Sequence, residues 1–409
     1  MANTLATPSW VVNETAQRFM NSVKGVPNFN RSYDDSFRQA GANVGNTILL
    51  RLPQRFTVRR GQAWAPQALL DQTVPVTLSY QSGVDFDWTS AQATTEIDRV
   101  RERYVNPAAD AIASDADAQG MLDVYTSINN SIGTPGTTPS ATLTYLQAVV
   151  KILDGAGTDD NIKAVLDTMA AATISNTVST LFNPSSDISA SNRAGRIQDR
   201  YLGISEWFQD QNVPAHTTGA FTSSTPLVNG AGQTGSTLVT DGWASGASSL
   251  KKGDTFTLNG VFGVNPLSYK STSRLQQFVV TADISDTTGA MTITISPSII
   301  TSGALQTVTN SPADNAGINV WAGTGTYAQT ATASPQSLVF HPDAFVFVMV
   351  DLVDPIAGAK AAFARSRDWG ISIRFVQQFM LATDQNGSRL DCLFGAAPYQ
   401  PRLACRVAG

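Results

Sequence analysis

The side chains that could carry out chemistry are few and lie far apart in the sequence. The two histidines, His216 and His341, have no cysteine or carboxylate at the spacing of a metal-binding set. Ser223 and Ser224 lack the G-x-S-x-G pattern that exposes a nucleophilic serine, and no convergent carboxylate pair of the glycosidase type can be found. We therefore expect structural histidines, no enzyme activity, no metal site and no cofactor.

Two cysteines, Cys392 and Cys405, are too few for a disulfide framework and too isolated for a zinc site. They lie at almost equal distances on either side of a turn at residues 398–400, so they could face each other across a hairpin. Because we expect a reducing cytoplasm, free buried thiols are favoured over a disulfide. The run DQNG at 384–387 resembles part of a calcium loop, but the terminal glutamate is missing and a plain turn is expected.

Composition indicates a globular protein with no basic surface for nucleic acid. The chain has 409 residues, of which 42% are hydrophobic and 14% charged, which suggests two or three domains with sizeable cores. The net charge is -5, so any nucleic acid nearby is expected to be enclosed rather than gripped. Neither a signal peptide nor a membrane-spanning run is predicted. Arginine greatly outnumbers lysine, which favours protein contacts.

The element that must organise the chain is a long helix. Apolar residues three or four apart, with Asp, Arg and Glu between them, predict a spine helix within residues 94–135. Pro107 and Gly120 predict a kink and a bend, and Asp115 with Asp117 is most simply a solvated face. The residues expected to form the buried core of this helix are Ile97, Val100, Ile112, Leu122 and Tyr125.

An amphipathic helix is predicted near the N-terminus, within an arm of residues 1–45. Gly, Pro and Asn follow the helix at once, so we expect it to stand off from the main core. It would then contact either a neighbouring copy of the chain or a different protein through Phe19 and Met20. The alternative is an ordinary first core helix.

Residues 46–93 predict an extended hairpin, with Pro53 and Pro75 placing its strands at an edge or a bulge. Basic side chains gather on its first half, and this range contains no lysine. The basic residues form either a solvated charged face or a basic edge that meets an acidic neighbour. As candidate inter-subunit contacts they are Arg51, Arg55, Arg59 and Arg60.

The sequence pattern changes twice beyond the long helix. Residues 136–220 alternate helix and strand, with IKAVL as a strand and the residues after it as a helix. Residues 221–335 hold nine charged residues among abundant Gly, Ser and Thr, which predicts an inserted all-β unit. The helix-and-strand pattern resumes at 336–369. In 370–409 the runs RLDCLFG and RLACRV predict a closing antiparallel pair.

Several of these runs, in this order, resemble the major capsid proteins of tailed bacteriophages. The runs are YDDSFRQAGANVGNTILLRLPQRFTV, VDFDWTS before the long helix, SIGTPGTTP, LFNP, DQNVPAHTTG before the β unit, and the closing GISIRFVQQF and RLDCLFGAAPYQPRLACRV. More narrowly, the chain is similar to coat proteins of short-tailed phages that have the Hong Kong 97 type fold with an inserted β-barrel domain. The resemblance covers nearly the whole chain, and it rests on collinearity rather than on any single motif.

The resemblance implies an α+β capsid fold that self-assembles through pentamers and hexamers into an icosahedral shell around phage double-stranded DNA. Assembly would take place in the host cytoplasm, with a scaffolding protein and a portal protein as partners. It would use no lysine crosslink, because such crosslinks need a lysine on the extended loop. The implied domains are the N-terminal arm 1–45, the extended loop 46–93, the spine helix 94–135, the axial domain 136–220 and 336–369, the inserted domain 221–335, and the C-terminal peripheral strands 370–409. The alternative function is a non-catalytic, β-rich surface or fibre-like binding protein.

Overall fold

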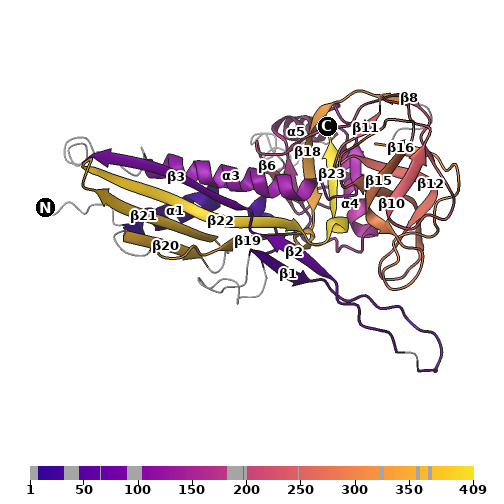
Figure 1. Cartoon of the computed structure of the whole chain (residues 1–409), viewed down its shortest axis with the longest axis horizontal. Coiled ribbons are helices and arrows are strands. Elements are labelled where there is room, and N and C mark those ends of the chain that lie inside the picture. Colours follow the sequence, from indigo (N-terminus) through magenta and orange to yellow (C-terminus); the bar gives the residue numbers. More distant parts are fainter. Residues whose placement is uncertain are drawn as a thin grey trace. The chain divides into compact units, whose positions relative to one another are not determined.

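The computed structural model describes residues 8–31, 46–64, 66–89, 104–181, 197, 200–246, 248–321, 327–355, 360–366 and 371–409. It contains both helices and mostly antiparallel sheets, which agrees with the predicted α+β class (Figure 1). The chain forms two compact units. Unit 1 comprises Met1–Arg51, Thr73–Met121 and Val346–Ala397, and unit 2 comprises Leu52–Gln72, Leu122–Phe345 and Pro398–Gly409.

The sheet of unit 1 is built around β22 (Gln385–Pro398). One edge of this strand pairs antiparallel with β21, and its other edge pairs with β3 over ten residues, from Gln385–Thr89 to Phe394–Tyr80. The strand order is β19-β22-β21-β20, with β3 also on β22. The further strands are β3 (Tyr80–Thr89), β19 (Phe345–Val350), β20 (Lys360–Ser366) and β21 (Ile371–Met380), and a separate ladder joins β1 (Thr47–Arg51) to β2 (Thr73–Thr77).

The long helix α3 (Asn106–Tyr125) runs along this sheet in Figure 1, and the hydroxyl of Ser82 on β3 donates to Asp115 at 2.5 Å. Pro107 stands in the first turn of α3, which directly follows two π-helical residues, 104 and 105, so the kink before it remains a prediction. The predicted part of the helix at 94–103 lies outside the described residues. A Cβ on Gly120 would come within 2.6 Å of Val26, so this glycine permits close packing.

The N-terminal helix α1 (Pro8–Ser22) corrects one prediction. It lies against β20 and β21 of its own unit, and Phe19 is only 2% exposed. Arg18 makes a bidentate ion pair with Asp110 of α3 at 2.8 and 2.9 Å. The alternative of an ordinary core helix is therefore right for this segment, because its apolar face finds a partner within the same chain. The side chain of Met20 lies outside the described residues.

Asp117 is a buried anchor for the turn after α1, not part of a solvated face. Its carboxylate is fully buried and accepts hydrogen bonds from the backbone N–H groups of Lys24, Gly25 and Val26, at 3.2, 3.1 and 2.7 Å. These three N–H groups lie just before and at the first residue of the short 3-10 helix η1 (Val26–Asn28), where no preceding helical turn supplies an acceptor. The residues after α1 thus form a turn that is hydrogen-bonded to Asp117 of α3.

Unit 2 has a mixed sheet in the order β4-β23-β18-β5-β6, with β7 also on β18. Helices α4 (Thr142–Asp154) and α5 (Thr168–Leu181) accompany it, and the predicted strand IKAVL is confirmed as β5. The core beside α4 includes Tyr145, Ile152 and Val339. The strands are β4 (Ser131–Gly133), β5 (Lys163–Leu166), β6 (Glu206–Gln209), β7 (Ala215–Thr217), β18 (Ala333–Phe340) and β23 (Ala404–Ala408), with η4 (Pro342–Ala344) and η5 (Pro401–Leu403) between strands.

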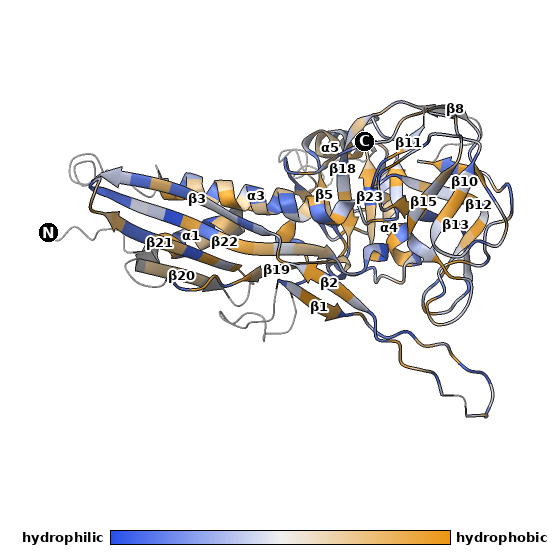
Figure 2. Cartoon of the chain, in the orientation of Figure 1, coloured by the Kyte–Doolittle hydropathy of each residue, from blue (hydrophilic) through white to orange (hydrophobic). Residues whose placement is uncertain are grey.

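The stretch from β8 to β17 is all-β in its described part, as its composition predicts. Its main sheet has the order β16-β12-β13-β15-β10-β9, and Figure 2 shows hydrophobic and hydrophilic bands alternating along these strands. Phe256, Phe278 and Ile293 belong to its own buried core. The strands are β8 (Phe221–Ser224), β9 (Leu227–Val228), β10 (Gly235–Asp241), β11 (Ser249–Leu250), β12 (Thr255–Val264), β13 (Ser271–Val280), β14 (Ile284–Ser285), β15 (Met291–Ile299), β16 (Ile318–Val320) and β17 (Tyr327–Gln329).

The predicted closing pair at the C-terminus is wrong. Strand β22 pairs with β21 and β3, whereas β23 pairs with β18 and runs parallel to β4. Cys392 and Cys405 therefore belong to two different sheets, and both are free and buried. Local pattern cannot distinguish a hairpin from two strands that each find a distant partner.

Neither thiol is expected to react in the folded protein. Burial raises the pKa of both Cys392 and Cys405 to about 12, from an ordinary value of 9.0. A thiol reagent at pH 8 should therefore find no reactive group in native protein and two per chain in denaturant. The raised pKa also makes the free energy of unfolding depend on pH, because the unfolded chain releases the thiol protons at a lower pH than the folded chain. The contribution of the two thiols to stability is complete below about pH 9 and is lost as the pH rises towards 12. Rapid reaction of native protein would contradict this.

Two substitutions on α3 should differ sharply in their effect on stability. Ile112 is 2% exposed, whereas Leu122 is 44% exposed, which corrects the expectation that both are core residues. An aspartate at Ile112 would place an unpaired charge in the core and should cost more than about 4 kcal/mol. Leu122→Asp should cost less than about 1 kcal/mol. Urea unfolding of the two variants checks this, and equal losses would refute it.

Candidate functional site

The loop between β1 and β2, residues 52–72, presents large apolar side chains to solvent. Val58 is 86% and Trp64 85% exposed, and Phe56, Leu69 and Leu70 are also exposed. Figure 2 shows hydrophobic residues interspersed with hydrophilic ones along this loop. Isolated exposed apolar residues are ordinary, but five on one loop indicate a surface that another molecule covers.

The loop keeps an extended form through polar contacts of its own. Leu52 N–H donates to Gln72 O at 2.8 Å, and Gln54 bonds Asp71. Further out, the side-chain amide of Gln67 accepts from Thr57 N–H at 2.9 Å and donates back to Thr57 O. These pairs hold the two sides of the loop together without a hydrophobic core, so the extended conformation of the loop is already present in the isolated subunit.

The four predicted arginines do not share one environment. Arg51, Arg59 and Arg60 are exposed, whereas Arg55 is partly buried and lines a cavity. Burial lowers the pKa of the Arg55 guanidinium from its ordinary value. Within the subunit, the exposure of three of the four side chains agrees with a solvated charged face. Arg55 differs, because it is partly buried.

A buried polar cluster in unit 2 was missed by sequence reasoning. Asp254, at the start of β12, is fully buried, and one of its oxygens lies 2.9 Å from His216 Nε2 and accepts from Trp321 Nε1 at 3.2 Å. The other oxygen accepts from the backbone N–H groups of Gly219 and Lys251 at 2.9 and 2.8 Å. His216 is therefore structural, as expected, but it has a carboxylate partner 38 residues away in the sequence.

Arg406 completes this cluster from β23. Its side chain is fully buried, donates from Nη2 to Gly253 O at 2.6 Å, and stacks 5.3 Å from the Trp321 ring centre. Burial lowers the pKa of its guanidinium to about 10 while the charge of Asp254 opposes the shift, so Arg406 stays protonated at neutral pH. Tyr125 of α3 lies 3.4 Å from His216 Nδ1. We call these five residues the Asp254 cluster: Tyr125, His216, Asp254, Trp321 and Arg406.

The Asp254 cluster fastens the all-β stretch to the sheet of unit 2. A second set of bonds acts beside it, because the Gln277 amide pairs with both backbone groups of Ser131 at 3.1 and 2.8 Å. The hydroxyls of Ser131 and Thr255 are 2.5 Å apart. Charge-assisted bonds in a buried setting are lost together if the two parts separate, so they favour one fixed arrangement.

A metal centre is not found in the part of the chain that the structure describes. No group of three or more His, Cys, Asp or Glu side chains there could hold a metal ion. His341 caps η4 by accepting from Asp343 N–H at 3.3 Å, which is a structural role. Among the helices of the described part, none is long and apolar enough to cross a membrane.

The predicted core of the spine helix is described only in part. Ile112 and Tyr125 are buried and Leu122 is exposed, while Ile97 and Val100 lie outside the described residues. Of the predicted contact residues, Phe19 is in the core of unit 1, and the four arginines are on or beside the loop at 52–72. The apolar residues of that loop were not singled out from the sequence, because an apolar residue type does not by itself show whether the side chain is exposed.

Comparison with known proteins gives one extensive match. Residues 39–408 match the family described as "P22 coat protein - gene protein 5". No curated protein sequence matches the chain.

Among solved structures, the chain is similar to "Mycobacterium phage Che8", with 12% identity, a TM-score of 0.43, and coverage of 94% of this chain and 91% of that one. It is also similar to "Capsid structure of the Cyanophage P-SCSP1u", at 10% identity, TM-score 0.44, and 89% and 83% coverage. The "CUS-3 coat protein I-domain" shares 26% identity over 24% of this chain and 96% of that one, with a TM-score of 0.19. With TM-scores below 0.5, these likenesses add nothing to the family match.

Proposed function

Because the chain belongs to the P22 coat protein family, it is a major capsid protein that forms the shell of a bacteriophage, and we propose that it assembles through pentamers and hexamers around double-stranded DNA. The family match over residues 39–408 carries this conclusion. The net charge of -5 supports a shell that encloses DNA rather than one that binds it tightly. The alternative of a fibre-like binding protein has no support.

The finer architecture belongs to the same proposal. We assign the chain a Hong Kong 97 type fold with residues 221–335 as an inserted domain and the other domain bounds as given above. The separate core of the all-β stretch and its bonding to the unit 2 sheet support an inserted domain. A scaffolding protein and a portal protein are the proposed partners, and the host cytoplasm is the proposed place of assembly.

The loop at 52–72 is the surface that we propose for contact between subunits. Its two sides are held together by its own polar contacts, and it exposes large apolar side chains that the subunit does not cover. Rings of five and six identical chains need interfaces that tolerate slightly different angles, and a long loop with few contacts to its own subunit supplies them. Many weak contacts then add up over a closed shell.

Electron microscopy of the purified chain, expressed alone and with a scaffolding protein, tests the function. We expect closed shells in negative stain and a single band on a reducing denaturing gel, because residues 46–93 contain no lysine for a crosslink. Monomers or trimers that bind glycans would refute the capsid function. A ladder of covalent oligomers would refute only the absence of crosslinks.

A further inference from the structure

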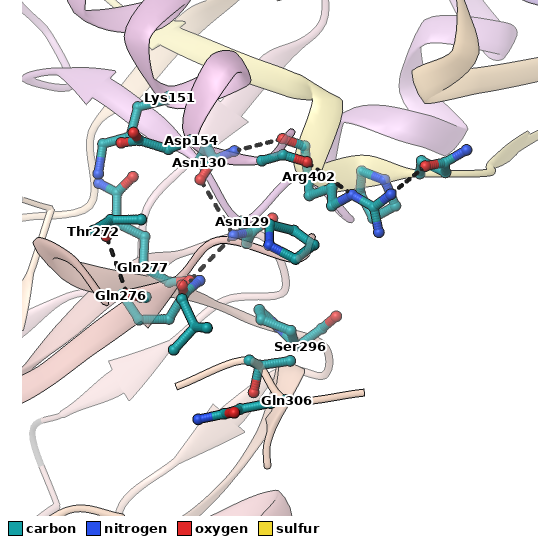
Figure 3. Close-up of a pocket in the computed structure, with 18 of the residues that line it drawn as sticks. Asn129, Asn130, Lys151, Asp154, Thr272, Gln276, Gln277, Ser296, Gln306 and Arg402 are labelled. Carbon is teal, nitrogen blue, oxygen red and sulfur yellow. Dashed lines mark hydrogen bonds between the residues drawn. The ribbon is translucent and has the colours of Figure 1, made fainter. Parts of the chain in front are cut away.

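Unit 2 contains a cavity of about 220 Å³ for which the proposed function gives no occupant (Figure 3). Its walls come from the loop at 52–72, helix α4, strands β13 and β15, and the segment that ends in η5. Figure 3 shows Lys151, Asp154, Asn130 and Arg402 around one side of it and Gln276 and Gln306 around the other. The volume is below that of most drug-sized sites, so the occupant must be small.

The charge of the cavity is opposite to that of the chain. Among the described residues, its lining includes four cationic side chains and one carboxylate, although the whole chain carries a net charge of -5. The single carboxylate, Asp154, is paired with Arg274. The other three cations are Arg55, Lys151 and Arg402.

None of those three cations has a carboxylate partner among the described residues. Arg402 donates to two neutral acceptors, Gly155 O at 3.0 Å and the Gln400 side chain at 2.6 Å. Burial lowers the pKa of both Arg55 and Lys151, and Asp154 is close enough to oppose this for Lys151 without forming an ion pair. Partly desolvated cations without a counter-charge are costly, and an anion between them would remove that cost.

We propose that this cavity binds a small free oxyanion, of the phosphate or diphosphate class, held chiefly by Arg55 and Lys151. Guanidinium and ammonium groups are the usual protein partners of phosphate oxygens. The amide-rich wall supplies neutral polar surface around them. Arg55 comes from the loop and Lys151 from α4, so a bound anion would tie the loop to the body of unit 2.

Calorimetric titration of dissociated full-length subunits with pyrophosphate tests this, in a phosphate-free buffer with chloride at matched ionic strength. We expect saturable binding to the wild-type chain and at least about tenfold weaker binding to Arg55→Gln and Lys151→Met. Matched controls are Arg60→Gln, which is exposed on the same loop, and Lys252→Met, which is exposed outside the cavity. Both controls should bind like the wild type.

Melting temperatures of the same variants show whether a loss of binding is caused by a folding defect. Lys151→Met keeps the length of the side chain and removes an uncompensated charge, so it should fold without the anion and gain no stability when pyrophosphate is added. Equal binding by all five proteins, or no binding by the wild type, would overturn the proposal. The proposal would also be overturned if Arg55→Gln and Lys151→Met left pyrophosphate binding unchanged but impaired shell growth. The two cations would then pair with an acidic side chain of a second copy of the chain.

Discussion

Replacing Asp254 by alanine should destabilise the subunit by about 3–5 kcal/mol, the range for breaking a buried charge pair. The change removes the acceptor of two backbone N–H groups and of Trp321 Nε1, and these donors would lose their buried carboxylate partner. It also leaves the positive charge of Arg406 buried without the opposing charge of Asp254. The substitution therefore lowers the free energy of unfolding in two ways, through the lost hydrogen bonds and through the uncompensated charge of Arg406.

Urea unfolding of soluble subunits measures this effect. The matched control is Asp283→Ala, which removes an exposed carboxylate of the same all-β stretch that pairs with Lys251 at 2.9 Å. An exposed pair of this kind contributes about 0–1 kcal/mol. Adding Arg406→Met to Asp254→Ala should recover part of the loss, since the uncompensated charge is then gone. If the two single aspartate variants lose the same stability, the Asp254 cluster does not have the role assigned to it.

Replacing both Val58 and Trp64 by serine should prevent closed shells from forming while leaving the subunit folded. Both side chains are almost fully exposed, so their loss should change the free energy of unfolding by less than about 0.5 kcal/mol. In a shell, burial of each large apolar side chain against a neighbour would stabilise the contact by about 1.5–3 kcal/mol. Because every subunit loses these contacts at once, the effect on assembly is multiplied.

Sedimentation velocity, with the proposed scaffolding protein present, measures shell assembly separately from the stability of the subunit. The control is Gln62→Ser, an exposed polar residue on the same loop, which should assemble normally. Urea unfolding of the double variant confirms that the subunit is intact. Normal shells from the Val58 and Trp64 variant would show that these exposed apolar side chains of the loop are not an assembly contact.

The elements that could be predicted from sequence are those with a complete local signal. Strand β5 and helix α5 follow from periodicity and breakers within the segments themselves, and the all-β stretch follows from its charge-poor composition. The pairing of β22 with β3 and of β23 with β18 could not be predicted, since a short loop before β23 looks the same for a hairpin and for two separate sheets.

The buried polar residues show a second limit. Asp117 and Asp254 look like ordinary surface carboxylates in the sequence, because a charged residue gives no local sign of burial. Their partners are backbone groups about 92 and 35 residues away, at Gly25 and Gly219. The mistake over Phe19 has a related cause, since an apolar helix face has the same pattern whether its partner is in the same chain or in another.

The position of β22 also sets the order in which the newly made chain can fold. Asp85 on β3 and its partner Arg389 on β22 are 304 residues apart, and the longest segment of unit 2, Leu122–Phe345, is encoded between them. At ordinary rates of synthesis, β3 leaves the ribosome roughly 15–60 s before the strand that bonds to its edge. During this interval the unpaired edge of β3 is a hazard for aggregation. The sheet of unit 2 is completed later still, because β23 follows β22 in the chain. A coat protein with this topology completes the sheet of unit 1 only after its last long strand, β22, has been made.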